Sequence, residues 1–122
     1  MYRAIHISPM IPSFDIKETV LFFHNLLDFK ILMDQKTYAI LSRDNSTIHI
    51  LPAGSVIGEM EFYIEVDDIE QIWENIKNKS NGLNLKKPFD REYGMREIHI
   101  IIPHTKTLLF IGQKNKLIYT DN

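Results

Sequence analysis

Hydrophobic and polar positions along the chain alternate first with the period of a strand and then with the period of a helix. In residues 2–8, Ile5 and Ile7 fall on one strand face, with His6 and Ser8 on the other, which predicts a first strand. In residues 16–27, apolar side chains recur three or four positions apart, which predicts a helix. The apolar stripe of this helix consists of Ile16, Val20, Phe23 and Leu27.

Polar residues at both ends of the predicted helix support its bounds. Asp15 stands at the N-cap position, and Glu18 follows at the spacing of a capping box. Asp28 comes directly after the last helical residue, where Asp tolerates the left-handed backbone expected there. Three strands are expected next, at residues 29–33, 38–42 and 47–51. Residues 52–58 hold a proline and two glycines, and they form the expected boundary between two halves of the chain.

The same order of elements begins again after this boundary. A strand is expected at residues 61–66, followed by an N-cap at Asp67 and Asp68 and by a second helix. The apolar stripe of this helix is Ile69, Ile72, Trp73 and Ile76. Further strands are expected at residues 85–89, 97–102 and 108–111, with a polar loop at 78–84 and a loosely held tail after residue 113.

The chain therefore shows the order strand, helix, three strands, twice. Each half is too small to bury its own sheet, so pairing of the two halves is the physical solution. We expect one domain, residues 1–122, of the α+β class, with two tandem βαβββ modules at about 2–52 and 59–113. The modules are expected to form a curved mixed sheet with the helices outside and a concave face between the halves.

Composition and charge exclude several classes of function. The chain has 14 Lys and Arg against 16 Asp and Glu, and this near balance argues against a nucleic-acid partner. It has no cysteine, which excludes disulfides, thiolate metal sites and a cysteine nucleophile. No apolar stretch approaches the roughly 20 residues that span a bilayer, and no signal-peptide pattern occurs. We therefore expect a cytoplasmic protein without membrane contact. The sequence also contains no motif that identifies catalytic residues.

Several stretches carry a resemblance to a known family. Residues 15–23, DIKETVLFF, and 26–29, LLDF, resemble the "D-L-E-x-x-x-x-F-Y … L-L-G-F" signature of the vicinal oxygen chelate superfamily. This superfamily includes glyoxalase I, bleomycin-resistance proteins and extradiol dioxygenases. Residues 64–69 resemble its second strand-to-helix junction, and residues 93–97 and 107–110 resemble its closing hairpin. The resemblance covers about residues 5–113 and implies the same fold of two βαβββ modules.

The resemblance first raises the question of whether this chain has a metal site. Transferred position by position, the metal ligands of the superfamily fall on Ser8, His49, Glu61 and Leu109, or Phe110 if the register slips by one. His49 and Glu61 are acceptable ligands, but serine is a poor ligand and leucine or phenylalanine none. A catalytic divalent metal usually has three protein ligands. We therefore expect no cofactor, with a divalent metal such as Zn, Fe, Mn or Ni on His49 and Glu61 as the alternative.

The bleomycin-resistance branch is the part of the superfamily that the chain resembles most. Its members bind a ligand between the two subunits of a homodimer and act by sequestration. The resemblance thus implies a metal-free homodimer that binds a cationic or aromatic, drug-like small molecule at its concave face or dimer interface. Candidate ligand-binding residues are Tyr38, Tyr63 and Tyr93 for aromatic contact, and His49, Glu61 and Arg96 for polar contact. Glu61 favours a cationic ligand.

Two other functions stay open at this point. One is a metal-dependent lyase, isomerase or dioxygenase in which Glu61 is a ligand or base. The other is a structural or interaction role, with the concave face filled by the protein's own side chains. Several candidate residues also have purely structural interpretations: a hydrogen-bonded pocket or core histidine for His49, solvation or pairing with Arg96 for Glu61, and a solvent-facing strand position for His99.

Overall fold

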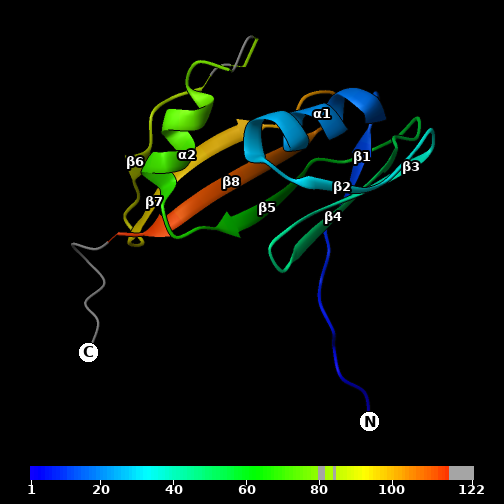
Figure 1. Cartoon of the computed structure of the whole chain (residues 1–122), viewed down its shortest axis with the longest axis horizontal. Coiled ribbons are helices and arrows are strands. Elements are labelled where there is room, and N and C mark those ends of the chain that lie inside the picture. Colours follow the sequence, from blue (N-terminus) through cyan, green and yellow to red (C-terminus); the bar gives the residue numbers. More distant parts are fainter. Residues whose placement is uncertain (80–81, 84, 116–122) are drawn as a thin grey trace. The chain divides into compact units, whose positions relative to one another are not determined.

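The computed structural model in Figure 1 describes residues 1–79, 82–83 and 85–115. Its elements follow in the order β1 (Met10–Ser13), α1 (Ile16–Leu27), β2 (Lys30–Gln35), β3 (Tyr38–Arg43), β4 (Ser46–Pro52), β5 (Met60–Glu65), α2 (Ile69–Ile76), β6 (Phe89–Asp90), β7 (Met95–Ile101) and β8 (Thr107–Lys114). The chain forms two compact units, and residues 102–106 belong to the first although they lie between β7 and β8. Each unit has one helix and a four-stranded sheet, so the predicted α+β class with two βαβββ modules is confirmed.

The sheet of the first unit has the strand order β1–β4–β3–β2, with β1 parallel to β4 and the other neighbours antiparallel. Helix α1 covers one face of this sheet, where the hydroxyls of Ser13 and Thr19 are hydrogen-bonded at 2.7 Å. The apolar strand residues buried on this face are Ile11, Ala39, Leu41, Ile48 and Ile50. Because strand side chains alternate between faces, Tyr38 and His49 lie on the face that α1 does not cover.

Hydrogen bonds confirm both predicted ends of α1. The Asp15 carboxylate accepts the N–H of Glu18 at 3.2 Å, as an N-cap does. Asp28 adopts the left-handed backbone with a φ of 59°, and the N–H of Phe29 donates to the carbonyl of Phe23 at 3.1 Å. Together with the left-handed Asp28, this second bond ends the helix after Leu27.

The predicted position of the first strand, residues 2–8, is wrong, because β1 begins at Met10. Met10 lies beside His49 in the parallel pair, and β4 begins at Ser46, so most of residues 2–8 extend past the end of β4. A strand forms only where a neighbour completes its backbone hydrogen bonds. Pro12 is tolerated inside β1 because β1 lies at the edge of its sheet, where a missing N–H breaks no bond.

The second unit repeats the arrangement, with the strand order β5–β8–β7–β6 and β5 parallel to β8. Helix α2 begins after its predicted N-cap Asp68, and the side-chain oxygen of Gln113 on β8 accepts the N–H of Ile69 at 2.8 Å. Gln113 shares its sheet face with the buried strand residues Ile98, Ile100, Leu109 and Ile111. Helix α2 therefore covers that face and leaves the opposite face, with Glu97 and His99, without a helix of its own unit.

The last strands differ from the predicted bounds. Strand β6 is limited to Phe89–Asp90 because only these two residues pair with β7 and Pro88 before them has no N–H to donate. Strand β8 continues to Lys114, beyond the predicted end of the fold at residue 113. The predicted loop at 78–84 lies partly, and the tail beyond residue 115 wholly, outside the described residues. Neither helix in the described part of the chain is long and apolar enough to cross a membrane.

Candidate functional site

Side chains from all four strands of the second sheet, together with one from the β6–β7 turn, gather on the face that α2 leaves uncovered. They are Tyr63, Phe89, Tyr93, Glu97, His99 and Phe110, which we call the Glu97 face. The strand register explains how they meet. Phe110 on the central strand β8 has Tyr63 beside it on β5 and His99 beside it on β7. Chain positions that are far apart are therefore brought to one surface by strand pairing alone.

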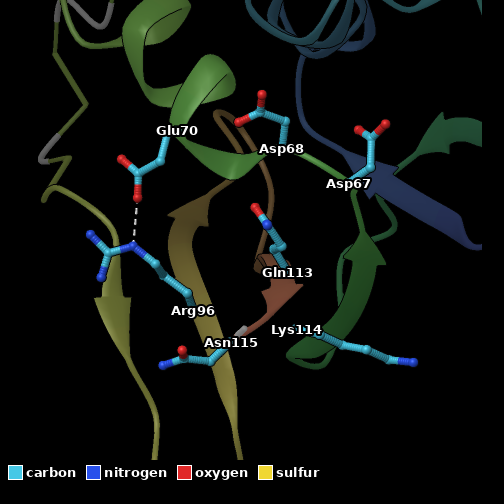
Figure 2. Close-up of a pocket in the computed structure, with 7 residues that line it drawn as sticks. All are labelled: Asp67, Asp68, Glu70, Arg96, Gln113, Lys114 and Asn115. Carbon is cyan, nitrogen blue, oxygen red and sulfur yellow. Dashed lines mark hydrogen bonds and ion pairs between the residues drawn. The ribbon is translucent and has the colours of Figure 1, made fainter. Parts of the chain in front are cut away.

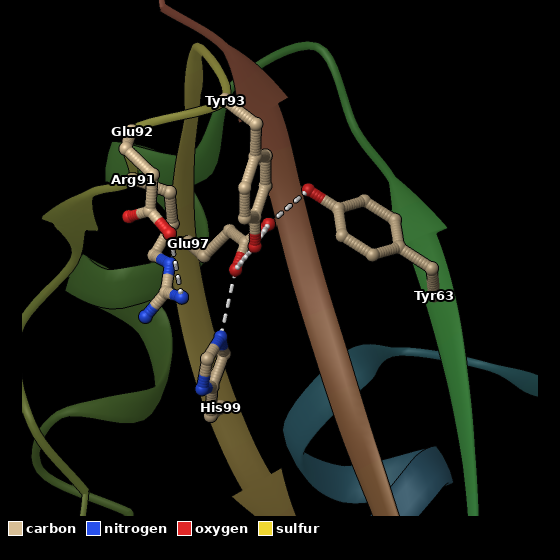
Figure 3. A network of polar contacts seen from close by, with 6 residues as sticks. All are labelled: Tyr63, Arg91, Glu92, Tyr93, Glu97 and His99. Carbon is tan, nitrogen blue, oxygen red and sulfur yellow. Dashed lines mark hydrogen bonds and ion pairs between the residues drawn. The ribbon is translucent and has the colours of Figure 1, made fainter.

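Glu97 is the centre of this face, and its side chain is 0 % exposed. Its carboxylate accepts hydrogen bonds from the hydroxyls of Tyr63 and Tyr93 and from Nε2 of His99, each at 2.7 Å (Figure 3). A buried charge is costly unless it is hydrogen-bonded, and three donors to one carboxylate supply those bonds. The network therefore keeps an ionised glutamate inside an aromatic environment.

The same contacts shift the ionisation of the residues that form them. Burial raises the pKa of Glu97, but the hydrogen bonds from His99, Tyr93 and Tyr63 outweigh it, so this pKa lies below its ordinary value. Burial and the hydrogen bond to Glu97 raise the pKa of Tyr63, and the hydrogen bond to Glu97 raises the pKa of Tyr93. At neutral pH the carboxylate is thus charged and both phenols are neutral donors.

Tyr63 reaches Glu97 only because β8 has a glycine between them. Gly112 lies beside Glu97 in the β7–β8 register, and Figure 3 shows the hydrogen bond of Tyr63 running from β5 across β8 to β7. A Cβ atom on Gly112 would lie 1.7 Å from the Tyr63 hydroxyl oxygen and 2.5 Å from its ring carbon Cζ. Any side chain at this position would therefore displace the phenol from Glu97.

Ring contacts fill the rest of the Glu97 face. The imidazole of His99 lies between Phe110, with ring centroids 4.1 Å apart, and Phe89, at 5.0 Å. Tyr63 stacks against Phe110 at 6.2 Å with an interplanar angle of 26°. Tyr63 and Tyr93 remain 41 % and 46 % exposed, so the face offers aromatic surface to solvent above a buried negative charge.

The side chain of Arg91 borders this face. The guanidinium of Arg91 lies 5.6 Å from the ring centre of Phe89 and 5.4 Å from that of Tyr93, both within cation–π range. Arg91 also pairs with the exposed carboxylate of Glu92 at 3.4 Å. Arg91 therefore contacts the two rings and the Glu92 carboxylate.

The structure brings together some of the six predicted ligand-binding residues. Tyr63 and Tyr93 meet on Glu97 in the second unit. Tyr38 and His49 meet in the first unit, where the Tyr38 hydroxyl lies 2.6 Å from Nδ1 of His49. These four residues therefore form two pairs, one in each unit, and each pair has a polar centre beside an aromatic ring.

The other two predicted residues are placed differently. Arg96 lies on the α2 side of β7 and pairs with Glu70 at 2.5 Å and Asp90 at 3.0 Å. Of the two structural interpretations of Glu61, pairing with Arg96 is therefore wrong. Glu61 is exposed on β5, on the same side of the strand as Tyr63. The expectation that His99 only faces solvent is also wrong, because its ring is packed and bonded to Glu97.

Sequence reasoning missed Glu97 and His99 as site residues. The signal available was their alternation with Ile98 and Ile100, which places both polar side chains on one strand face. Alternation of this kind usually indicates a solvated face, since the apolar residues alone mark the core. The polar network forms because Tyr63 and Tyr93, which lie on other elements, donate hydrogen bonds to Glu97 on that face.

The side chains at the transferred metal positions do not fit a catalytic metal. The hydroxyl of Ser8 is hydrogen-bonded to that of Thr47 and lies ahead of β1. Leu109 is buried on the α2 side of its sheet, and Phe110 offers only a ring. Within the described ranges, no group of three His, Cys, Asp or Glu side chains is placed to hold a metal ion.

A separate polar cavity of about 330 Å³ opens where α2 begins (Figure 2). Its lining consists of Asp67, Asp68, Glu70, Arg96, Gln113, Lys114 and Asn115. Asp68 and Gln113 cap the helix, and the hydrogen bond from Arg96 to Glu70 raises the pKa of that guanidinium. These side chains stabilise the start of α2, so the Glu97 face is the better candidate for a binding site.

Comparison with known proteins places the fold. No protein-family model and no curated protein matches the sequence. Among solved structures, a bleomycin resistance determinant encoded on transposon Tn5 matches with a TM-score of 0.75 and 19 % identity over 91 % of this chain and 98 % of that one. The bleomycin-binding protein of bleomycin-producing Streptomyces verticillus, complexed with copper(II)-bleomycin, matches with a TM-score of 0.72 and 18 % identity. The match covers 91 % of this chain and 97 % of that one. Lactoylglutathione lyase from Agrobacterium tumefaciens matches with a TM-score of 0.73 and 9 % identity, over 97 % of this chain and 100 % of that one.

These matches define the class of fold. The chain, with its two βαβββ modules, has the same fold as a bleomycin resistance determinant, a bleomycin-binding protein and a lactoylglutathione lyase. The predicted resemblance is thereby confirmed for the fold. At these identities the fold does not decide between binding and catalysis, so the choice depends on the residues of the site.

Proposed function

We propose that this protein binds a flat, cationic, aromatic small molecule on the Glu97 face and acts by holding it rather than by converting it. The observation that carries this proposal is a fully buried, ionised carboxylate beneath two partly exposed tyrosines. The likeness in fold to two proteins described as bleomycin-binding or bleomycin-resistance proteins supports it. The absence of a fitting metal donor set among the described residues leaves no specific support for the metal-dependent alternative.

The charge and shape of the face favour this class of ligand. Tyr63 and Tyr93 can stack on a flat ring system, and a cation over such rings gains about 0.5–2 kcal/mol. Glu61 and Glu65 lie on the same side of β5 as Tyr63, and both are exposed. Together with Glu97 they place negative charge around Tyr63, which attracts cations and repels anions.

Acridine orange, a flat fluorescent cation, provides a direct test at pH 8. We expect saturable binding that Tyr93→Ala weakens about tenfold, the loss that corresponds to one aromatic and cation–π contact. Tyr2→Ala is the matched control, because Tyr2 is an exposed tyrosine of the first unit and its removal leaves binding unchanged. Absence of saturable binding, equal binding by Tyr93→Ala, or chemical change of the recovered dye overturns the proposal. Elemental analysis that finds stoichiometric Zn, Fe, Mn or Ni, lost in the His49→Ala variant, would overturn the proposal that the protein binds its ligand without a metal.

We also propose that the chain forms a homodimer, as the resemblance to bleomycin-resistance proteins implies. Two-fold dimers are the commonest oligomers of soluble proteins. Sedimentation equilibrium at micromolar concentration is expected to give twice the chain mass of 14.4 kDa. A mass near 14.4 kDa under these conditions contradicts this part of the proposal.

A further inference from the structure

His99 has one ring nitrogen that the Glu97 network uses and one that it does not. Nε2 lies 2.7 Å from the Glu97 carboxylate. Figure 3 shows the other ring nitrogen on the side of the imidazole that points away from Glu97. Within the described part of the chain, this Nδ1 makes no hydrogen bond, and the side chain is 25 % exposed.

The carboxylate decides which nitrogen of the neutral ring carries the proton. An ionised carboxylate can only accept, so Nε2 must donate its N–H to Glu97. In the neutral imidazole the lone pair then lies on Nδ1, which becomes an acceptor. The two tyrosines strengthen this assignment, because their hydroxyls also donate to Glu97 and keep it in its charged form.

The position of the ring is fixed as firmly as its tautomer. Phe110 and Phe89 contact the imidazole at centroid distances of 4.1 and 5.0 Å. The imidazole therefore cannot turn freely to exchange its two nitrogens. A fixed acceptor at the border of an aromatic surface is the kind of polar group that orients a ligand in a mostly apolar site.

We infer that Nδ1 of His99 is the acceptor that selects, among flat aromatic cations, those with a ring N–H directed at it. This inference rests on the proposed function, and it narrows the ligand class to protonated nitrogen heterocycles. A quaternised heterocycle of the same shape and charge has no N–H to donate. It would leave Nδ1 buried under the ligand without a hydrogen-bond partner. An acceptor left unpaired in this way lowers the affinity of the site strongly.

Acridine orange and its ring-N-methylated form are matched probes, because they share the flat cation and differ in the ring N–H. Fluorescence titration at pH 8, where imidazole is ordinarily neutral, is expected to show at least tenfold tighter binding of the N–H form. His99→Phe keeps a ring at this position but has no acceptor, so the two probes are expected to bind it equally. His6→Phe is the matched control, because His6 is exposed ahead of β1 in the first unit, and it is expected to preserve the discrimination.

The outcomes separate this inference from the proposed function. Equal binding of both probes to the wild-type protein overturns the selection by His99 and leaves the binding function standing. Failure of both probes to bind overturns the binding function itself. If His99→Phe does not fold, the ¹⁵N chemical shifts of His99 provide a second measurement. An unprotonated Nδ1 that shifts on addition of acridine orange supports the inference, whereas a protonated Nδ1 at pH 8 overturns it.

Discussion

Glu97 shows how a charged residue can be stable inside an aromatic cluster. Removing a carboxylate from water costs several kcal/mol unless hydrogen bonds replace those of the solvent. Here Tyr63, Tyr93 and His99 provide three such bonds at 2.7 Å. Since each of the three donors comes with a ring, the same residues that satisfy the charge also form the apolar surface around it.

Replacing Glu97 with glutamine is expected to lower the free energy of unfolding by about 1–3 kcal/mol at pH 7, because the amide group turns a donor toward other donors. The wild-type protein should also lose stability in acid more steeply than the variant. The pKa of Glu97 in the folded protein lies below its ordinary value of 4.5, so the unfolded chain binds this proton more readily. The contribution of Glu97 is therefore complete above that value and is lost as the pH falls through the folded pKa.

Urea unfolding at pH 7 and at about pH 3 measures both effects of the Glu97 substitution. Glu59→Gln serves as the control, because Glu59 is exposed and its substitution should leave both values nearly unchanged. If Glu97→Gln kept the full acid dependence of the wild-type protein, the network would not be what holds the folded pKa of Glu97 low.

The sequence indicates part of this cluster and not the rest, for a physical reason. Tyr63 and Tyr93 are predicted from residue type alone, because large rings with a polar tip are typical of binding surfaces. Glu97 and His99 could not be assigned, since their burial depends on partners up to 34 positions away in the chain. A local pattern shows which face a side chain occupies and cannot show what covers it.

Strand β8 is crossed by a side chain that belongs to another strand. The Tyr63 phenol passes over Gly112 on its way from β5 to Glu97 on β7. A glycine in a strand interior normally weakens the strand, because it packs no side chain and costs conformational entropy. At this position the missing side chain is what allows β5 and β7, which are not neighbours, to be joined by a hydrogen bond.

Gly112→Ala is expected to break this connection and destabilise the protein by about 1–3 kcal/mol, because the new methyl group overlaps the Tyr63 hydroxyl. The tyrosine ionisation, followed by ultraviolet absorbance at high pH, should gain one phenol that titrates near pH 10, as the raised pKa of Tyr63 is lost. Gly58→Ala is the matched control, since nothing lies within 4 Å of a Cβ there. An unchanged titration in Gly112→Ala would show that Tyr63 does not depend on this gap.

Helix α1 was predictable to the residue, and strands β1 and β6 were not. Helix α1 occupies the predicted residues 16–27, because its periodicity, Asp15 and Asp28 are all local in the sequence. Strand β1 is displaced from the predicted residues 2–8, and β6 is shortened, because a strand exists only beside a neighbour. The bounds of a strand therefore depend on register, which local sequence does not contain.

The order of elements along the chain predicted two modules, and the structure shows where the chain passes between them. Residues 102–106 connect β7 to β8 in the second unit, yet they belong to the first unit. Thr19 donates its hydroxyl to the carbonyl of Pro103 at 2.9 Å, and the N–H of Phe14 donates to the carbonyl of His104 at 2.8 Å. Nothing in the local sequence of this turn indicated contacts with residues more than 80 positions earlier.

Thr19→Val is expected to lower the free energy of unfolding by about 1–3 kcal/mol, because it keeps the shape of the side chain and removes a buried hydroxyl. The hydroxyl of Ser13 and the carbonyl of Pro103 would both lose a partner. Thr37→Val, at an exposed turn position, is the control and should change stability by less than about 0.5 kcal/mol. Equal unfolding midpoints for the two variants would show that the anchoring of residues 102–106 contributes nothing.

The gap at Gly112 also provides a fingerprint by which other sequences of this fold can be sorted. A tyrosine in the fifth strand, Tyr-x-x-x-Glu-x-His leading into the seventh and a glycine in the eighth, 15 positions after the glutamate (97 to 112), together encode the three-donor carboxylate. A chain with Glu-x-His but with any side chain at the glycine position is expected to have at most two donors there. One residue type in the central strand would thus separate chains with a fully bonded buried charge from chains that must solvate it.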